Sequence, residues 1–541
     1  MPSWIGCEKL RRMAKHQLNS RAAGVVAVAV MCSRVLGLAR EMIFASLFGS
    51  TLMGIFLVAF RAPNLLRDLF AEGALSTAFI TVFSKRIEQE GDASAWKLAS
   101  KVATLALLVL TICVALGIIF ARPLIGVLAW GFDPESKEIT IWLTQVMFPF
   151  ILLVSLAALV MGMLNSKDVF GVPAMASSFF NMGSIAGGLL IGWMLDPSFG
   201  ERALTGLAIG TLVGGFLQLA VQLPSLSKLG FRFRFDFGWG DPGVRQILIL
   251  MVPAVIAASA VQVNVMVNGI FASVLGPSAV AWLNMAFRLM QLPLGLFGVA
   301  VATVTLPVVS RIAATAGQEG LFGETLGKAM RLAIFLTLPS TVGLAVLAHP
   351  IIALIYGRGK YLPEDTLATA EALQFYALGL MAYSCIKVLS PAFYAINRKW
   401  TPMLVSFVSI GLNLILNAVL TFHLGMEHRG LALSTAIAAT ANFLTLYVVM
   451  WKHTGRMDTR IFVFSFTKCL VASVALAAGA WAALHFGAYW LYDAALPIRI
   501  VALGVAIGIP AALYFLACLV LRVDETKAFL AAVRRKLARG R

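Results

Sequence analysis

Charged residues are scarce in this chain. Lysine, arginine, aspartate and glutamate make up 13% of the 541 residues, and hydrophobic residues make up 60%. The mean hydropathy is +0.89. A typical soluble protein is about one quarter charged. This composition excludes an ordinary water-soluble fold and predicts a chain whose solvent is lipid.

Residue patterns that carry catalytic or metal chemistry are also missing. The six cysteines and six histidines are scattered, without a CxxC pair or an HExxH motif. No glycine-rich phosphate loop, GxSxG motif or large polar domain occurs. We therefore expect no catalytic residue, no cofactor and no ATP hydrolysis by this chain alone, and a function other than that of an enzyme.

Long apolar runs are abundant instead. A helix needs roughly 20 apolar residues to cross the hydrocarbon of a bilayer, and about fourteen runs of this kind occur. The sequence thus predicts an all-α polytopic membrane protein. The predicted spans are 23–48, 52–80, 98–121, 139–164, 171–194, 203–225, 246–273, 278–309, 328–348, 366–396, 400–422, 430–451, 464–486 and 498–521.

Basic residues gather in every second connection between these runs, and such connections face the cytoplasm. Both termini are therefore predicted to be cytoplasmic, and the net charge of +18 is assigned to topology and anionic lipid, with no nucleic-acid partner. The basic clusters include Lys9, Arg11, Arg12, Lys15, Arg21, Lys85, Arg86, Lys167, Lys228, Arg232, Arg234, Arg245, Arg311, Arg398, Lys399, Lys452, Arg460, Arg534, Arg535 and Lys536.

The chain contains an internal repeat. The segment 77–91 is similar to 305–320, and the segment with Asn165, Pro173 and Asn181 is similar to the one with Asn397, Pro402 and Asn413, at offsets near 230 residues. An even number of spans per repeat predicts two parallel six-helix lobes related by a pseudo-two-fold axis, as in many secondary transporters, with two further helices. The expected parts are a basic leader 1–22, an N-lobe 23–240, a C-lobe 241–455, spans 13 and 14 over 456–522, and a basic cytoplasmic tail 523–541.

Arginines interrupt the first two predicted spans. Arg34 and Arg40 lie in the first, and Arg61 and Arg67 lie in the second. A cation in hydrocarbon costs several kcal/mol, so such residues mark functional sites by default. The nearby carboxylates Glu41, Asp68 and Glu72 are candidates for gating or ion pairing. The alternative is that all these charges form ion pairs between helices or reach the interface at span ends.

Arg288 argues for a ligand, because no carboxylate lies within twenty residues of it on either side. The planar guanidinium fork suits phosphate, which it can bind through two oxygens. Lys387 lies near a proline in another span and is a further candidate phosphate contact or a residue reaching the interface. We expect substrate-binding roles for Arg34, Arg67 and Arg288 first, then for Arg40, Arg61 and Lys387.

Several segments resemble one family. SRVLGLARE, AFRAPNLLRDLFAEGALSTAFITVFS, FRLMQLPLGLFGVAVATVTLP and VLSPAFYAI are similar to the MurJ (MviN) lipid II flippases, members of the multidrug/oligosaccharidyl-lipid/polysaccharide exporter superfamily. The resemblance implies alternating access that carries lipid II, a polyprenyl-pyrophosphate-linked muropeptide, to the periplasmic leaflet. It also implies a central cavity lined by Arg34, Arg40, Arg67 and Arg288, a lipid-tail groove at the last two helices, and a bacterial inner-membrane location.

The chain departs from this family where acidic residues are usual, since Gly54, Phe287 and Gln291 stand there. The cavity is thus expected to be unusually cationic. Some relatives bind sodium in the second lobe, which makes Asn268, Asn413, Asn417 and Thr440 weak sodium candidates, although hydrogen bonding between helices explains them as well. We expect transport to be coupled either to a monovalent cation or to the membrane potential.

Other functions stay open on the sequence alone. An exporter of another polyprenyl-linked oligosaccharide, or a multidrug-type antiporter with a cationic cavity, would share the two-lobe plan. A membrane enzyme acting on polyprenyl phosphates or a structural scaffold is disfavoured by the missing acids and by the arginines in spans. The expected partners are lipid II and membrane lipids, and the chain is expected to act as a monomer.

Overall fold

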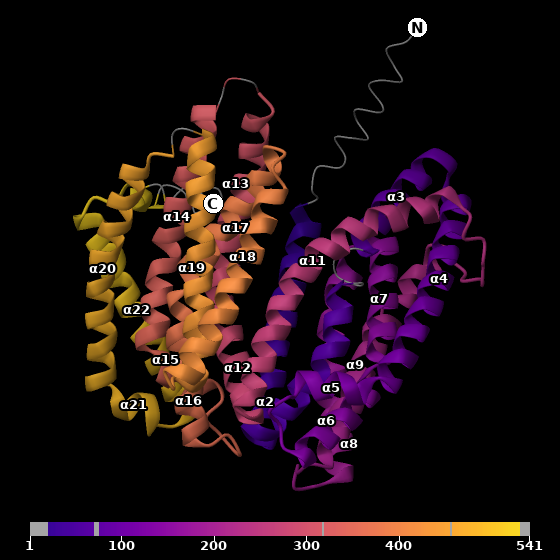
Figure 1. Ribbon diagram of the computed structural model, residues 1–541, viewed down its shortest axis with the longest axis horizontal. Helices are drawn as coiled ribbons and strands as arrows, with labels where there is room; N and C mark the ends of the chain where they lie inside the picture. Colours follow the sequence, from indigo (N-terminus) through magenta and orange to yellow (C-terminus); the bar gives the residue numbers. More distant parts are fainter. Residues whose placement is uncertain are drawn as a thin grey trace. The chain divides into compact units, whose positions relative to one another are not determined.

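The computed structural model describes residues 20–69, 75–315, 317, 319–454, 457–527 and 529–530. Within these ranges every regular element is a helix (Figure 1). The predicted all-α membrane fold is therefore confirmed. Glu72, most of the basic leader and most of the basic tail lie outside the described residues.

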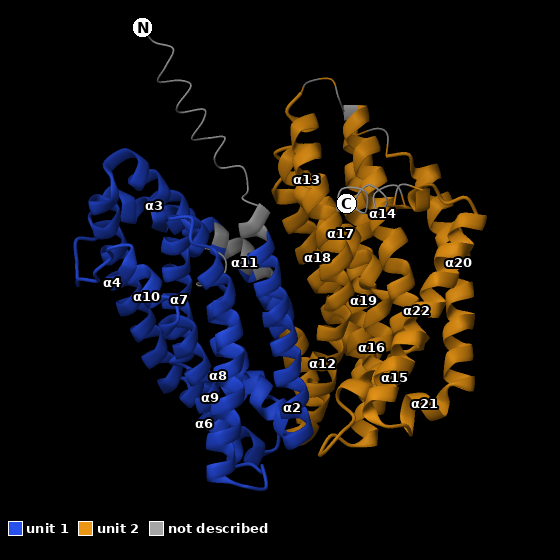
Figure 2. Ribbon diagram, turned by 180° about the vertical axis from the view of Figure 1, so that it is seen from behind, with its two compact units in different colours: residues 1–48, 52–266 blue, residues 49–51, 267–541 orange. Residues whose placement is uncertain are grey.

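The chain divides into two compact units, 1–48 with 52–266 and 49–51 with 267–541 (Figure 2). Helix α11 (Pro242–Val274) begins in the first unit and ends in the second. Apart from residues 49–51 of α2, the first unit holds α2 (Ser20–Arg67), α3 (Ser76–Glu90), α4 (Asp92–Ile119), α5 (Ala121–Leu128), α6 (Pro134–Met147), α7 (Phe150–Asn165), α8 (Gly171–Leu195), α9 (Ala203–Ala220) and α10 (Leu223–Lys228).

The second unit repeats this use of long helices with short connecting ones. Two π-helical turns, η2 (Leu294–Gly298) and η3 (Asn417–His423), occur in it. Its α-helices are α12 (Pro277–Pro293), α13 (Val299–Ala313), α14 (Glu319–Val346), α15 (Ala348–Ile355), α16 (Pro363–Leu378), α17 (Leu380–Ala395), α18 (Trp400–Leu416), α19 (Glu427–Thr454), α20 (Thr459–Phe486), α21 (Ala488–Tyr492) and α22 (Leu496–Val520).

Eleven helices of the described chain are long and apolar enough to cross a membrane, or up to twelve if one bent pair counts as a span. That pair is α16 with α17, bent by 44°. Apolar shorter helices lie at Pro242–Pro253 and Gln262–Val274 within α11. The chain is a multi-span membrane protein, and the number fourteen stays a prediction.

Helix α2 covers both of the first two predicted spans. It is broken at Gly49, whose φ of 72° and ψ of −177° are not helical. This is where the sequence predicts a connection, at residues 50–51. A Cβ atom at Gly49 would lie 2.9 Å from the carbonyl oxygen of Lys360. Positive φ and close backbone approach both require glycine here.

Small residues let helices of the first unit approach closely. On α8 and α9, an added Cβ at Gly210 would lie 2.3 Å from the backbone nitrogen of Gly188, and one at Gly206 would lie 2.3 Å from that of Gly192. Membrane helices use such glycine faces because lipid supplies no hydrophobic force between them. The α8–α9 pair thus forms a tightly packed part of this unit.

Candidate functional site

The first two candidate cations lie on the first half of α2. Arg34 is exposed, and the guanidinium carbon of Arg40 lies 5.2 Å from the centre of the Phe180 ring of α8. A guanidinium over an aromatic face gains electrostatic attraction without a carboxylate. Glu41 follows at once and is half-buried. Arg40 is therefore held against α8, whereas Arg34 is exposed.

Arg67, at the end of α2, pairs with the next residue. Its Nη2 and Nε atoms donate hydrogen bonds to one carboxylate oxygen of Asp68, at 2.7 and 3.1 Å. The other Asp68 oxygen accepts bonds from Asn64, at 3.4 Å, and from Gln262 of α11, at 3.1 Å. Arg67 and Asp68 each expose about a quarter of the side chain, 23% and 24%. Asp68 therefore neutralises Arg67 and is itself held from two sides.

Arg61 lies six residues before Arg67 on α2 and is partly exposed. Pro63 lies inside the same helix and leaves a backbone carbonyl without its usual partner. Glu72, the third predicted carboxylate, falls outside the described residues. The structure thus places the α2 cations on one helix and brings Arg67 together with Asp68.

Arg288 lies on α12 in the second unit. It is exposed, and its Nε atom donates to the side-chain oxygen of Asn284, one turn earlier, at 3.1 Å. Phe287, which stands where the family usually has an acid, packs edge-on against Tyr376 at 5.3 Å between ring centres. Helix α12 ends at Pro293 and continues as the π-helical turn η2. Such turns are frequent at functional sites.

Lys387, on α17, is also exposed and lies four residues before Pro391. Among the positions that depart from the family, Gly54 is buried in α2 and Gln291 is exposed on α12. Each unit thus carries its own cations: Arg34, Arg40, Arg61 and Arg67 in the first, Arg288 and Lys387 in the second. That all six contact one ligand stays a prediction.

Three of the sodium candidates form a hydrogen-bonded cluster. Asn417 donates to Asn268 at 2.7 Å and to Asn413 at 3.4 Å, and Ser434 donates to Asn417. Thr440 is not among them, because its hydroxyl donates to the carbonyl oxygen of Ala436 in its own helix at 2.8 Å. The side-chain oxygens of Asn268, Asn413 and Asn417 already accept hydrogen bonds. The geometry favours interhelical bonding over cation binding.

No group of three histidine, cysteine, aspartate or glutamate residues within the described chain could hold a metal ion. The sequence reasoning missed Gln262 and Ser434, which complete the two polar clusters. Both are common polar residues in long helices, and only their three-dimensional neighbours distinguish them. Asn64 could have been found, because it lies one helical turn before Asp68.

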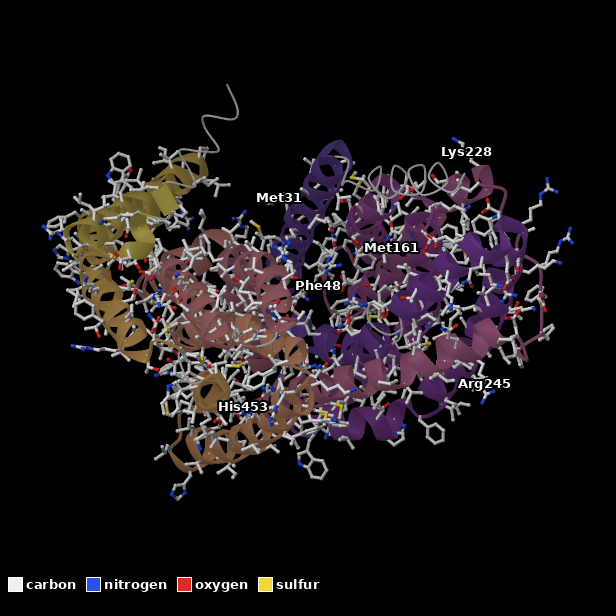
Figure 3. The ribbon with its side chains drawn as sticks, turned by 90° about the horizontal axis from the view of Figure 1, so that it is seen from above. Met31, Phe48, Met161, Lys228, Arg245 and His453 are labelled. Atoms are coloured by element: carbon white, nitrogen blue, oxygen red, sulfur yellow. The ribbon has the colours of Figure 1, made fainter. Side chains whose placement is uncertain are left out.

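Charged residues outside the spans anchor the first unit. Asp241, before α11, accepts hydrogen bonds from Arg86 at 2.5 Å and Lys101 at 2.9 Å, and from the backbone N–H of Gly243 at 2.8 Å. Burial acts to raise the pKa of Asp241, but these bonds outweigh it and lower the pKa to about 2. In contrast, the side chains of Lys228 and Arg245 project outward (Figure 3).

Comparison with known proteins gives one consistent result. A family model described as lipid II flippase MurJ matches residues 44–501. A probable lipid II flippase MurJ of Vibrio cholerae serotype O1 is 35% identical over 78% of this chain and 81% of its own length. A probable lipid II flippase MurJ of Rickettsia prowazekii is 33% identical over 93% of this chain and 98% of its own length. The lipid II flippase MurJ of Burkholderia cenocepacia is 33% identical over 92% of this chain and 96% of its own length.

Solved structures agree with these sequence relatives. A lipid II flippase MurJ in an inward closed conformation has a TM-score of 0.72 and 26% identity, covering 91% of this chain and 98% of that one. An inward-facing multidrug resistance transporter of the MATE family has a TM-score of 0.61 at 16% identity, covering 81% and 99%. The second likeness concerns the fold alone.

Proposed function

The chain belongs to the MurJ family and is a lipid II flippase, a transporter and not an enzyme, and from this premise we propose that its intramembrane cations bind the pyrophosphate of the lipid II headgroup. The observation that carries the proposal is the placement of guanidinium groups on apolar helices. Arg34 and Arg288 are exposed on α2 and α12. Cations in such helices require an anion or water to be tolerated.

The residues have graded roles in this proposal. Arg34, Arg67 and Arg288 bind phosphate oxygens, and Arg40, Arg61 and Lys387 contact the headgroup more peripherally. A guanidinium can donate two parallel bonds to one phosphate, which favours arginine over lysine for the main contacts. Asp68 holds Arg67 in place through a 2.7 Å bond before substrate arrives. A pyrophosphate oxygen then competes with Asp68 for the same guanidinium.

Transport follows from binding in this proposal. The two units alternate access to the sides of the membrane, while the polyprenyl tail stays in lipid and lies against α20 and α22. We place both termini in the cytoplasm and the chain in a bacterial inner membrane, as a monomer among membrane lipids. The free energy for transport comes from the membrane potential or from a monovalent cation gradient. The membrane potential is worth about 2.3 kcal/mol per charge per 100 mV.

The test uses the full chain in vesicles with fluorescent lipid II. Arg34→Glu and Arg288→Glu each replace a cation with an anion and should lower flipping at least 10-fold. Arg122→Glu is the matched control, because Arg122 is 70% exposed and pairs with Glu138 at 2.6 Å far along the chain from the candidate cations. Full flipping by the Arg34 and Arg288 variants would contradict the proposal.

A second measurement tests the function in cells. Depletion of this protein should leave lipid II in the cytoplasmic leaflet, as measured by its accessibility to an external label. Re-expression of the natural chain should restore the label, whereas the Arg288→Glu variant should not. An unchanged leaflet distribution after depletion would refute lipid II as the substrate.

A further inference from the structure

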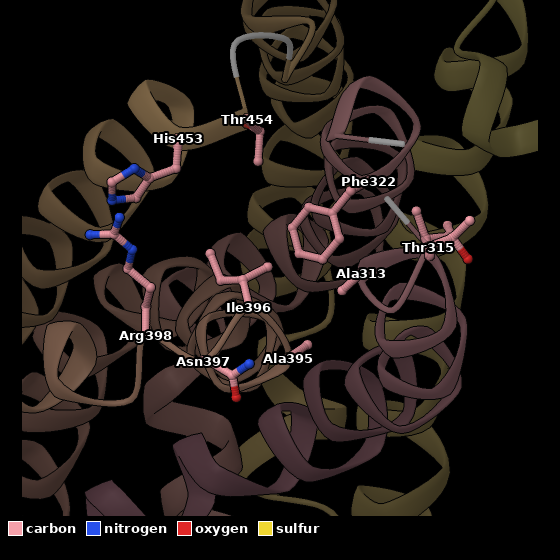
Figure 4. A pocket seen from close by; sticks show the side chains of 10 residues that line it. Ala313, Thr315, Phe322, Ala395, Ile396, Asn397, Arg398, His453 and Thr454 are labelled. Carbon is pink, nitrogen blue, oxygen red and sulfur yellow. The ribbon is translucent and has the colours of Figure 1, made fainter. Parts of the chain in front are cut away.

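A pocket of about 330 Å³ opens at one end of the second unit. It is formed where α13, α17 and α19 end and α14 begins, and its lining includes Thr315, Phe322, Ile396, Arg398, His453 and Thr454 (Figure 4). Pockets for small ligands occupy about 300–1,000 Å³. We name this cavity the Arg398 pocket. Its lining contains none of the cations assigned to lipid II.

Two nitrogen-bearing side chains meet at the Arg398 pocket. Figure 4 shows the guanidinium of Arg398 and the imidazole of His453 turned toward one another across the rim. Both side chains are exposed, and no carboxylate among the described residues pairs with either. An imidazole can donate a hydrogen bond in either protonation state, and a guanidinium always can. Together they offer donors for an anion.

Backbone geometry fixes Arg398 at this place. Helix α17 ends with Asn397 in the left-handed region, at φ 58°. The N–H of Arg398 then donates to the carbonyl oxygen of Phe393 at 2.9 Å, and that of Asn397 donates to Tyr394 at 3.1 Å. These two backbone hydrogen bonds form a Schellman motif, which ends a helix in a defined conformation. Arg398 is thus held by its backbone and not by a side-chain partner.

The first unit contains a turn of similar backbone conformation in which the basic residue has a carboxylate partner. After α7, Asp168 is left-handed at φ 59°, and the next N–H donates to Leu164 at 3.0 Å. The cation of that turn, Lys167, pairs with Asp92 of α4 and lies 5.8 Å from the Trp96 ring centre. The Arg398 pocket has an aromatic residue, Phe322 of α14, but among described residues no such carboxylate.

The floor of the Arg398 pocket is apolar, formed by Phe322 and Ile396 with neighbouring aliphatic groups. Lys452 is adjacent in sequence to His453 and adds positive charge. We propose that the Arg398 pocket binds a phosphate-bearing anion, either the headgroup of an anionic lipid or soluble phosphate.

The experiment uses the full purified chain with two probes. In one arm, nanodiscs of phosphatidylcholine with or without phosphatidylglycerol are examined by native mass spectrometry for retained phosphatidylglycerol. In the other arm, inorganic phosphate is titrated in detergent and the thermal midpoint is recorded. The test variant is Arg398→Gln with His453→Gln, and Lys399→Gln is the control, because Lys399 is exposed beside Arg398 but does not line the pocket.

The test variant should lose at least 10-fold in affinity for one probe, and the control should stay within twofold. Retention of lipid alone identifies a headgroup site, and a phosphate response alone identifies a soluble ligand. Equal binding by the natural chain and the test variant would overturn the proposal, as would an equal loss in Lys399→Gln. Binding that instead disappears in Arg288→Gln would also overturn it. Arg398→Lys, which keeps the charge, distinguishes lost binding from misfolding.

Discussion

Arg331 of α14 donates a hydrogen bond to Glu525 at 2.8 Å, although 194 residues separate them in sequence. Each side chain is only 9% exposed, and the second oxygen of Glu525 accepts a bond from Ser465 of α20 at 2.9 Å. The segment after α22 is thereby tied to two helices of the second unit. A buried charge that loses its partner is expensive to keep.

Glu525→Gln should destabilise the second unit strongly, by about 3 kcal/mol, because it leaves the Arg331 guanidinium buried without a countercharge. Thermal unfolding in detergent, followed by intrinsic fluorescence, measures the change. Glu138→Gln is the control, since Glu138 forms an exposed pair with Arg122, with side chains 57% and 70% exposed. A surface pair contributes about 0–1 kcal/mol. Equal effects of the two variants would show that the Arg331–Glu525 pair is not structurally important.

Asp241 should make the stability of the first unit depend on pH. Its pKa of about 2 in the folded chain lies below the ordinary 3.8, so its contribution is complete above about pH 4 and is lost as pH falls through 2. A depression of this size corresponds to about 2 kcal/mol. Asp241→Asn should therefore lower the thermal midpoint at pH 7, and its difference from the natural chain should shrink between pH 4 and pH 3.

The control for this prediction is Asp236→Asn in the same connection, which lacks the contacts with Arg86 and Lys101. It should lower the midpoint less at pH 7. A difference between Asp241→Asn and the natural chain that grows as the pH falls would contradict the assignment of the ion pairs.

The asparagine cluster should act in packing and not in ion coupling. Asn417→Leu removes the group that joins Asn268, Asn413 and Ser434 and should cost about 1–3 kcal/mol, since it leaves buried polar groups without partners. Thr440→Val, which loses only a bond within its own helix, should cost less than about 1 kcal/mol. Thermal midpoints measure both.

The same cluster predicts the effect of ions on transport. Replacing sodium with potassium in the vesicle assay should change lipid II flipping less than twofold. A loss of 10-fold or more on removal of sodium, and its restoration by sodium alone, would show that these amides bind the ion despite their hydrogen bonds.

Gly49→Ala should destabilise the break in α2. The φ of 72° with ψ of −177° is almost restricted to glycine, and the new Cβ would meet the Lys360 carbonyl oxygen at 2.9 Å. Such strain costs about 1–3 kcal/mol. Gly126→Ala, in α5 with nothing within 4 Å of its Cβ position, should instead stabilise by up to about 1 kcal/mol. A thermal midpoint that is unchanged in Gly49→Ala would contradict the strained turn.

Much of this fold could be predicted from hydropathy, because lipid demands long apolar helices whose lengths are visible in the sequence. The break at Gly49 was predicted as a connection, since Ser50 and Thr51 interrupt two apolar runs. The placement of Arg34, Arg67 and Arg288 in membrane helices was likewise predicted from their flanking residues. These features depend on neighbours in the chain, which the sequence displays directly.

The side-chain partners were harder to predict, because periodicity identifies a helix face but not what packs on it. Asp68 was expected to pair with an arginine, yet its bond from Gln262 joins residues from different helices. Arg331 and Glu525 belong to segments whose proximity no local pattern encodes. The Arg398 pocket was missed for the same reason, since His453 and Phe322 approach it from separate helices.

The turns after α7 and α17 each contain a left-handed residue, so one turn can guide substitutions in the other. In the α7 turn, Lys167 forms an ion pair with Asp92. The α17 turn has a similar backbone, but Arg398 has no carboxylate partner among the described residues. A carboxylate placed within reach of Arg398, as Asp92 lies within reach of Lys167, would give the second unit a comparable ion pair. A duplicated fold thus supplies a ready template for closing the pocket without redesigning the backbone.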